Sequence, residues 1–224
     1  MRKCRWAVAT VAALVLCVSV LATGTASAST TTTEAMVRGK LLSLSNLPAG
    51  WTLTNVPATN KGYSGPCAAA LSPKPRPGLA EAYVAFTDRG RSPLLGEKVV
   101  FGKAVTNRYN YVNAVLKSCK YLTFALGGID EKGTVDPLSF PKLGSSSSAY
   151  TITVPTTLGV SVGIDIVIVR SGPYALVVEY STMGTPDSSV LETFVHQALA
   201  KVTGVGSTEP SPDEVPPTTV PPFQ

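Results

Sequence analysis

The clearest pattern in this chain is an alternation of apolar and polar residues in its second half. Residues 150–154 alternate between apolar side chains and threonine, and residues 160–168 alternate over a longer run. After a turn at residues 171–173, residues 174–180 continue with the same period of two. This period is that of a β-strand with one buried face. We predict three antiparallel strands joined by short turns, with one face buried and the other partly exposed to water.

Shorter alternations predict further strands earlier in the chain. Residues 80–87 and 94–101 are rich in Val, Tyr and Phe, and they flank the turn-rich segment 89–93. This arrangement favours a hairpin. A short strand is expected over residues 51–56. Two weaker candidates complete the set: residues 122–125 and 133–140.

Three segments place apolar residues at helical spacing. They are residues 34–44, residues 103–118 and the segment from Thr185 to Val202. Thr185 followed by Pro186 matches an N-cap and the first helical position, and Gly204 is expected to end this helix. Together with the strands, this order predicts the α+β class, in which a twisted antiparallel sheet packs against about three helices that cover its one apolar face.

The first 28 residues have the organisation of a secretory signal peptide. Basic residues among the first five precede an apolar run, and the run is followed by Ala26-Ser27-Ala28, a pattern that signal peptidase cleaves. The alternative is an uncleaved membrane anchor, because the apolar run approaches the ~18–20 residues that span a bilayer. Lipidation at Cys17 is disfavoured because Leu16 is larger than the small residue expected before a lipidated cysteine.

Cleavage after Ala28 divides the chain into a signal peptide and three further parts. Residues 29–33 are a polar leader, residues 34–205 are a single α+β domain, and residues 206–224 are a tail. The tail is rich in Pro, Ser and Thr and cannot bury a core, so we expect it to be disordered. The mature chain would have no membrane span, and we expect it to be secreted or associated with the cell envelope.

Charge is unevenly distributed along the 224 residues, whose formal net charge is +5. Residues 38–120 contain 12 basic and 3 acidic side chains, whereas residues 121–224 contain 4 basic and 10 acidic ones. A basic half could bind an anionic surface such as phospholipid or a wall polymer. Because no predicted helix carries a dense basic stripe, we favour an ordinary solvated surface and expect no nucleic-acid partner.

Two of the four cysteines, Cys67 and Cys119, follow the predicted signal peptide. An exported chain with two thiols favours one disulfide. Cys67 lies within residues 60–78, where Gly, Pro and Lys predict a long loop, and Cys119 follows the helix predicted over 103–118. The alternative is a reactive or metal-binding pair, but the chain has no Cys-x-x-Cys spacing and a single histidine.

No set of residues in the sequence predicts a catalytic centre. His196 is the only histidine, and it falls on the polar side of the last predicted helix, which favours a surface position. Ser139 and Lys142 have Ser-x-x-Lys spacing, but Pro141 opposes the helix that this chemistry needs. The acidic residues within 130–136 are more typical of a Gly-rich turn than of a cation site. We therefore expect no enzyme activity, no metal site and no cofactor.

Several short motifs resemble those of a group of actinobacterial exported proteins. They are Leu47–Trp51 (Leu-Pro-Ala-Gly-Trp), Glu97–Phe101, the helix end at 116–119 (Leu-Lys-Ser-Cys) and residues 167–172. The group includes the extracellular sensor domain of PknH-type mycobacterial kinases and its secreted or lipoprotein relatives, and the resemblance covers residues 34–202. It implies a PsbP-like α+β fold and a cleft suspected of binding a ligand, and it implies no catalytic residues.

The resemblance and the missing catalytic set lead to a hypothesis of function. We expect a non-enzymatic, exported, sensor-like domain that binds a small ligand or a cell-envelope component. A ligand cleft is expected near Tyr63, Tyr83, Asp165 and Arg170, which offer aromatic and polar groups. One alternative is an envelope hydrolase, which needs two carboxylates ~5–10 Å apart across a cleft. Another is a purely structural or interaction module.

Trp51 is the one tryptophan outside the predicted signal peptide. Its ring could be a binding platform or a structural anchor. Pro48 and Gly50 form a sharp turn directly before it, so the ring enters the sheet just after the first predicted helix. A bulky ring at that place packs most easily beneath the helix, and we therefore predict an anchor.

Overall fold

The computed structural model describes residues 25–54, 63–64, 67–71, 76–90, 92–126, 129–156 and 159–204. Within these ranges the chain forms one antiparallel sheet with helices packed against it. The strands are β1 (Trp51–Leu53), β2 (Tyr63–Ser64), β3 (Ala80–Asp88), β4 (Leu94–Phe101), β5 (Tyr121–Leu126), β6 (Ile129–Pro137), β7 (Ser146–Pro155), β8 (Ser161–Ser171) and β9 (Tyr174–Met183). The helices are α1 (Thr25–Arg38), the short 3-10 helix η1 (Leu44–Asn46), α2 (Ala68–Leu71), α3 (Val105–Ser118) and α4 (Ser188–Thr203).

The described strands follow the order β1-β3-β4-β9-β8-β7-β6-β5-β2 across the sheet, and each neighbouring pair is antiparallel. The predicted three-stranded meander is confirmed as β7, β8 and β9, and the predicted hairpin is confirmed as β3 and β4. Strand β9 also pairs with β4, which joins the hairpin to the meander. The short strands β1 and β2 lie at opposite edges of the sheet.

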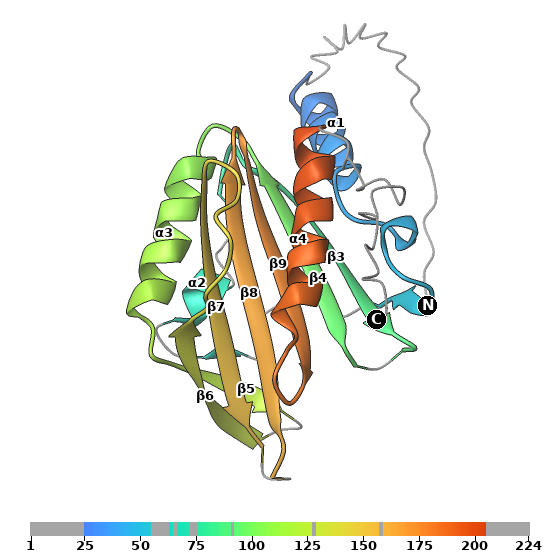
Figure 1. The fold of residues 1–224 in the computed structure, drawn as a ribbon. Helices are drawn as coiled ribbons and strands as arrows, with labels where there is room; N and C mark the ends of the chain where they lie inside the picture. Colours follow the sequence, from blue (N-terminus) through green and yellow to red (C-terminus); the bar gives the residue numbers. More distant parts are fainter. Residues whose placement is uncertain are drawn as a thin grey trace, which may run out of the picture.

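Helices cover both faces of the sheet, whereas the sequence predicts three helices on one face. The α4 face carries Val167 and Val169 of β8 and packs against α1 and α4. The α3 face carries Ile166 and Ile168 of the same strand and packs against α3 and α2 (Figure 1). All four β8 side chains are buried. Because this strand is apolar on both sides, a cover on one face alone would leave large apolar side chains in water.

Each face of the sheet has its own hydrophobic core. The largest fully buried apolar residues on the α4 face come from α1, β3, β4, β9 and α4, and they are Val37, Phe86, Leu95, Val99, Leu176 and Leu191. On the α3 face they come from α3, β5, β7 and β8, and they are Leu116, Leu122, Ile152, Ile166 and Ile168. The sheet is therefore the middle layer of three.

Helix α1 begins and ends earlier than the apolar spacing predicts, over Thr25–Arg38 instead of residues 34–44. In a continued helix, the N–H of Leu42 would donate to a backbone carbonyl four residues earlier. It donates instead to Oε2 of Glu97 on β4, at 2.6 Å. This carboxyl oxygen takes the place of the helical acceptor and attaches the chain to the sheet.

The N-cap of α4 is Asp187 and not Thr185, as the sequence predicts. The Asp187 carboxylate accepts hydrogen bonds from the Ser189 hydroxyl at 2.6 Å and from the Ser189 N–H at 2.9 Å. These bonds hold the pKa of Asp187 below its usual range. At the other end, Gly204 adopts a left-handed φ of 72° and accounts for the predicted helix stop.

The described residues confirm the α+β class, the antiparallel sheet and the single disulfide. The PsbP-like assignment stays a prediction, as do the cleavage after Ala28 and the domain boundaries. Residues 25–33, assigned above to the signal end and the leader, belong to α1, and β2 and α2 lie inside the loop predicted over 60–78. Residues 1–24 and the tail at 206–224 lie outside the described part. None of the described helices is long and apolar enough to cross a membrane.

Candidate functional site

Ionisable side chains gather on the α3 face of three neighbouring strands, beside the first turns of α3. The register pairs Tyr83 of β3 with Lys98 of β4, and Gly96 of β4 with Glu179 of β9. Directly paired residues of antiparallel strands lie on the same face. We call the group the ionisable cluster, and its members are Glu81, Tyr83, Lys98, Glu179 and, from α3, Arg108.

Glu81 is the counter-ion of two cations in the ionisable cluster. Its Oε2 lies 2.6 Å from Nζ of Lys98, and its Oε1 lies 3.4 Å from Nη2 of Arg108. The Arg108 side chain is only 4% exposed. Burial lowers the pKa of Arg108, and the charge of Glu81 opposes this effect. Since both carboxylate oxygens of Glu81 have partners, its role is to hold Lys98 and Arg108 in place.

Tyr83 and Glu179 meet over Gly96, where the sheet carries no side chain. A Cβ atom built on Gly96 would lie 3.0 Å from Oη of Tyr83 and 3.6 Å from Oε2 of Glu179. Burial raises the pKa of Tyr83, and the neighbouring Glu179 raises it further. Burial also raises the pKa of Glu179 to about 7, although Lys98 lowers it. The pair offers a protonated hydroxyl beside a carboxyl whose charge changes near neutral pH.

Arg76 and Tyr111 adjoin the ionisable cluster on its helical side. The guanidinium carbon of Arg76 lies 5.4 Å from the ring centroid of Tyr111, which is a cation–π contact. Arg76 is also close enough to add to the lowering of the Arg108 pKa that burial causes. Arg76 and Tyr111 are exposed, so they add a solvated cation and an aromatic ring to the margin of the site.

The four residues predicted to line one cleft do not lie together. Tyr83 belongs to the ionisable cluster. Arg170 is on the same face of β8, but β9 and β4 separate it from Tyr83, and its Nε donates to Oγ of Ser146 at 3.1 Å. Asp165 lies on the α4 face. Tyr63 is in the edge strand β2, and its side chain is not among the described ones.

Asp165 is a buried carboxyl held by the sheet itself. It is 2% exposed, and its Oδ1 accepts a hydrogen bond from Oγ1 of Thr151 at 2.7 Å. Burial raises the pKa of Asp165, and the hydrogen bond opposes this effect. The residue paired with it on β9, Tyr180, is also buried. The face predicted to be partly exposed to water is therefore closed at this point.

Glu97 is a second buried carboxyl, and the sequence pattern predicts no site role for it. It is completely buried on the α4 face, and Oε2 accepts the hydrogen bond from Leu42. Burial raises the pKa of Glu97 to about 7, against the effects of the Leu42 hydrogen bond and of the charge on Lys201. Its place in a strand that ends in Val99, Val100 and Phe101 is a signal of burial, but no local pattern identifies Leu42, which lies 55 positions away, as its partner.

Trp51 lies at the edge of the α4-face core. Its ring meets Phe194 of α4 edge to face, with centroids 5.4 Å apart and an interplanar angle of 79°. The ring is partly buried and packs against the core cluster. This aromatic contact is with the last helix, whereas the sequence predicts packing beneath the first. The geometry favours an anchor, and its contribution to stability stays a prediction.

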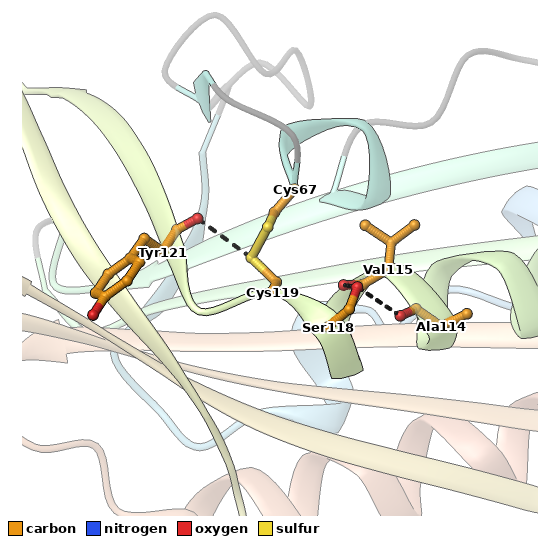
Figure 2. The surroundings of a disulfide bond; sticks show 6 residues. All are labelled: Cys67, Ala114, Val115, Ser118, Cys119 and Tyr121. Atoms are coloured by element: carbon orange, nitrogen blue, oxygen red, sulfur yellow. Dashed lines mark hydrogen bonds between the residues drawn. A yellow bond between two sulfur atoms is a disulfide. The ribbon is translucent and has the colours of Figure 1, made fainter.

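The predicted disulfide joins Cys67 and Cys119, whose Cα atoms are 5.8 Å apart. Both cysteines are buried in the α3-face core, and the bond attaches the start of α2 to the end of α3 (Figure 2). The Sγ atom of Cys119 lies 3.4 Å from the carbonyl oxygen of Tyr121. A disulfide sulfur carries no hydrogen, so this is a contact and not a hydrogen bond. A free cysteine nucleophile is excluded at these two positions.

Other chemistry considered from the sequence finds no support in the described geometry. His196 is exposed on α4, with Nε2 3.7 Å from Oε1 of Glu192, as predicted for a surface residue. Ser139 and Lys142 lie in irregular backbone after β6, not on a helix. Among the described residues, no group of three or more His, Cys, Asp or Glu side chains is arranged to hold a metal ion.

Comparison with known proteins shows a structural resemblance but no match in sequence. No family model matches the chain, and no curated protein matches it. The fold is similar to the crystal structure of the extracellular domain of PknH from Mycobacterium tuberculosis, with a TM-score of 0.60 and 12% identity over 76% of this chain and 96% of that one. An uncharacterised protein from Mycobacterium smegmatis matches with a TM-score of 0.43 and 14% identity over 71% of this chain and 92% of that one. The resemblance indicated by the motifs is thus confirmed as a likeness of fold.

Proposed function

We propose that this protein is an exported, non-enzymatic, sensor-like domain that binds a ligand at the ionisable cluster. The observation that carries the proposal is the pairing of Tyr83 and Glu179 over Gly96. Burial is the main cause of both raised pKa values, and a ligand that hydrogen-bonds to the two groups would offset part of this cost. A small number of polar groups held at fixed positions is a feature of binding sites.

The location and the sensor-like role have separate support. The disulfide between Cys67 and Cys119 is typical of an oxidising compartment, and the predicted signal peptide points the same way. The fold is shared with the extracellular domain of a mycobacterial kinase. These observations favour a secreted or envelope-associated protein whose partner is a small ligand or an envelope component.

Thermal shifts with fractionated cell-envelope extracts test this function. A fraction that holds the ligand raises the melting temperature of the wild-type protein, because ligand binding stabilises the folded state. Tyr83→Phe keeps the ring and removes the hydroxyl, and we expect it to abolish the shift. Tyr121→Phe is the matched control, because Tyr121 is exposed on β5, outside the ionisable cluster.

Two results would contradict the proposal. One is a flat response of the wild-type protein to every fraction. The other is a shift that persists in full in Tyr83→Phe, which would place the ligand elsewhere on the molecule.

A carboxylate-based hydrolase is the second candidate, and Glu179 is the observation that favours it. A carboxyl with a pKa of about 7 is suited to act as a general acid. The other carboxyl of the ionisable cluster, Glu81, forms ion pairs with Lys98 and Arg108, and these pairs make it a weaker base or nucleophile. The two functions are separated by incubating the protein with the envelope fraction that raises its melting temperature and then analysing the fraction by chromatography. Unchanged components support binding, and new fragments that Glu179→Gln no longer produces support hydrolysis.

A further inference from the structure

The α4 face carries a segment whose attachment to the sheet depends on one carboxyl. We call residues 39–47, which follow α1 and include η1, the connecting segment. We infer that this segment is held against the sheet while Glu97 is neutral and is released when Glu97 ionises. The inference goes beyond the proposed function, and it does not depend on a ligand at the ionisable cluster.

The connecting segment is attached to the elements beyond α1 at few places. Among the described residues, one hydrogen bond joins it to the sheet, from the Leu42 N–H to Glu97. One more joins it to α4, from Nζ of Lys201 to Oδ1 of Asn46. Leu41 and Leu42 are buried, but the three residues after them are exposed. A segment with few buried contacts can open locally while the rest of the domain stays folded.

The place of Glu97 makes its ionised form costly while the segment covers it. The side chain is completely buried, and its neighbours in the register, Val84 and Val178, are apolar. Oε2 accepts the hydrogen bond from Leu42, whereas Oε1 has no hydrogen-bond partner among the described residues. A carboxylate needs donors for both oxygens, and a buried charge without them costs free energy. Release of the segment would let water supply these donors.

The charges around Glu97 do not remove this cost. Burial raises the pKa of Glu97 to about 7, although the Leu42 hydrogen bond and the charge of Lys201 on α4 lower it. Arg38 and Lys40, beside the start of the segment, are exposed and half-buried. No salt bridge joins Glu97 to a cation in the described part of the chain.

The sign of the pH dependence follows from the two states of the segment. After release, the carboxyl is hydrated and its pKa returns toward 4.5. The attached state therefore binds more protons than the released state between pH 4.5 and about 7. Attachment is strongest below this window and weakens as the pH rises through it.

Amide hydrogen exchange of the isotope-labelled protein tests the inference. The Leu42 amide reports release of the segment, and the amide of Val167, at the centre of the sheet, reports global unfolding. Each rate is divided by that of an unprotected amide at the same pH. We expect Leu42 to open more readily than Val167, and its opening constant to rise roughly 70-fold between pH 5 and pH 8.

Three variants assign the pH dependence to Glu97. Glu97→Gln keeps an acceptor oxygen and does not titrate, so the Leu42 opening constant should no longer depend on pH. Glu34→Gln removes an exposed carboxyl of α1 and should behave as the wild type does. Lys201→Gln removes the charge that favours ionised Glu97, and it should move the point where the rise levels off to a higher pH.

Three results would overturn the inference. The first is an equal opening constant for Leu42 and Val167 at every pH, because the segment would then be released only by global unfolding. The second is a Leu42 opening constant that does not change with pH in the wild type. The third is a wild-type rise in Glu97→Gln. The proposed function would stand in each case, because it is tested by thermal shifts that depend on Tyr83.

Discussion

The backbone N–H of Leu42 donates a hydrogen bond of 2.6 Å to Oε2 of Glu97, and so joins the segment after α1 to the middle of β4. The second oxygen of this fully buried carboxyl, Oε1, has no hydrogen-bond partner among the described residues. Lys201 of α4 lies near enough to favour the ionised form, and its Nζ donates to Oδ1 of Asn46 at 3.3 Å. One carboxyl therefore connects three segments that are distant in sequence.

We expect the stability of the protein to fall as the pH rises from about 4.5 to about 7. Burial raises the pKa of Glu97 and of Glu179 from 4.5 to about 7. The folded state therefore binds more protons than the unfolded state within this window. The stability due to the protonated forms is fully present below pH 4.5 and is lost as the pH rises through 7. Each carboxyl contributes roughly 3 kcal/mol to the change in unfolding free energy. Urea denaturation at stepped pH measures it.

Glu97→Gln identifies the part of this pH dependence that belongs to Glu97. Glutamine keeps an oxygen that can accept from Leu42, but it does not titrate in this range. The slope of unfolding free energy against pH should be reduced by about half in this variant, since Glu179 still titrates. Glu34→Gln, on the exposed surface of α1, is the control and should keep the wild-type slope. A wild-type slope in Glu97→Gln would show that the buried carboxyl does not change its charge on unfolding.

The strands with regular alternation and the helices with regular spacing could be predicted from the sequence. Residues 80–87 and 94–101 correspond to β3 and β4, and residues 103–118 contain α3. These elements are determined by local periodicity. The alternation over 160–168 predicts one apolar row on β8 and so one covered face, whereas Val167 and Val169 form a second apolar row on the other face. The assignment of faces depends on both rows.

The candidate site was only partly predictable, because its members meet through strand register. Tyr83 was predicted as a cleft residue, but Lys98 and Glu179 were not, although each faces the same side of the sheet. Strand β9 follows β4 in space but not in sequence, so no local pattern brings Glu179 to Gly96. Asp165 was assigned to the same cleft as Tyr83, and only the register shows that it lies on the other face.

Trp51→Ala should lower the free energy of unfolding by about 3 kcal/mol, the lower end for loss of a large aromatic side chain. The partial burial of Trp51 and its edge-to-face contact with Phe194 are the reasons for this figure. Trp51→Phe keeps an aromatic edge against Phe194 and should lose about half as much. Both are measured by chemical denaturation. A near-wild-type midpoint in Trp51→Ala, combined with loss of ligand binding, would make the ring a binding platform and not an anchor.

Removal of the disulfide should cost roughly 4 kcal/mol, because Cys67 and Cys119 close a loop with a sequence separation of 52. The double variant Cys67→Ser, Cys119→Ser measures this without leaving a free thiol. Adding a reductant to the wild type should lower its denaturation midpoint toward that of the double variant. The double variant itself should not respond to reductant. Equal midpoints for oxidised wild type and double variant would show that the link does not constrain the unfolded chain.

Gly163→Ala should destabilise the fold by about 2 kcal/mol through overpacking. Gly163 lies on β8 where the chain between β9 and α4 crosses it, and a Cβ there would overlap the Gly184 carbonyl oxygen and the ring of Pro186. These are backbone and ring atoms, so no side-chain rotation can relieve the overlap. The movement would also disturb the 2.8 Å hydrogen bond from the Gly184 N–H to the Ser161 carbonyl. Urea denaturation compares this variant with Gly39→Ala, where the nearest atom to the new methyl is 3.5 Å away. Equal unfolding free energies for the two variants would show that β8 can shift to accept the methyl group. The packing of the segment between β9 and α4 against the sheet would then not require glycine at position 163.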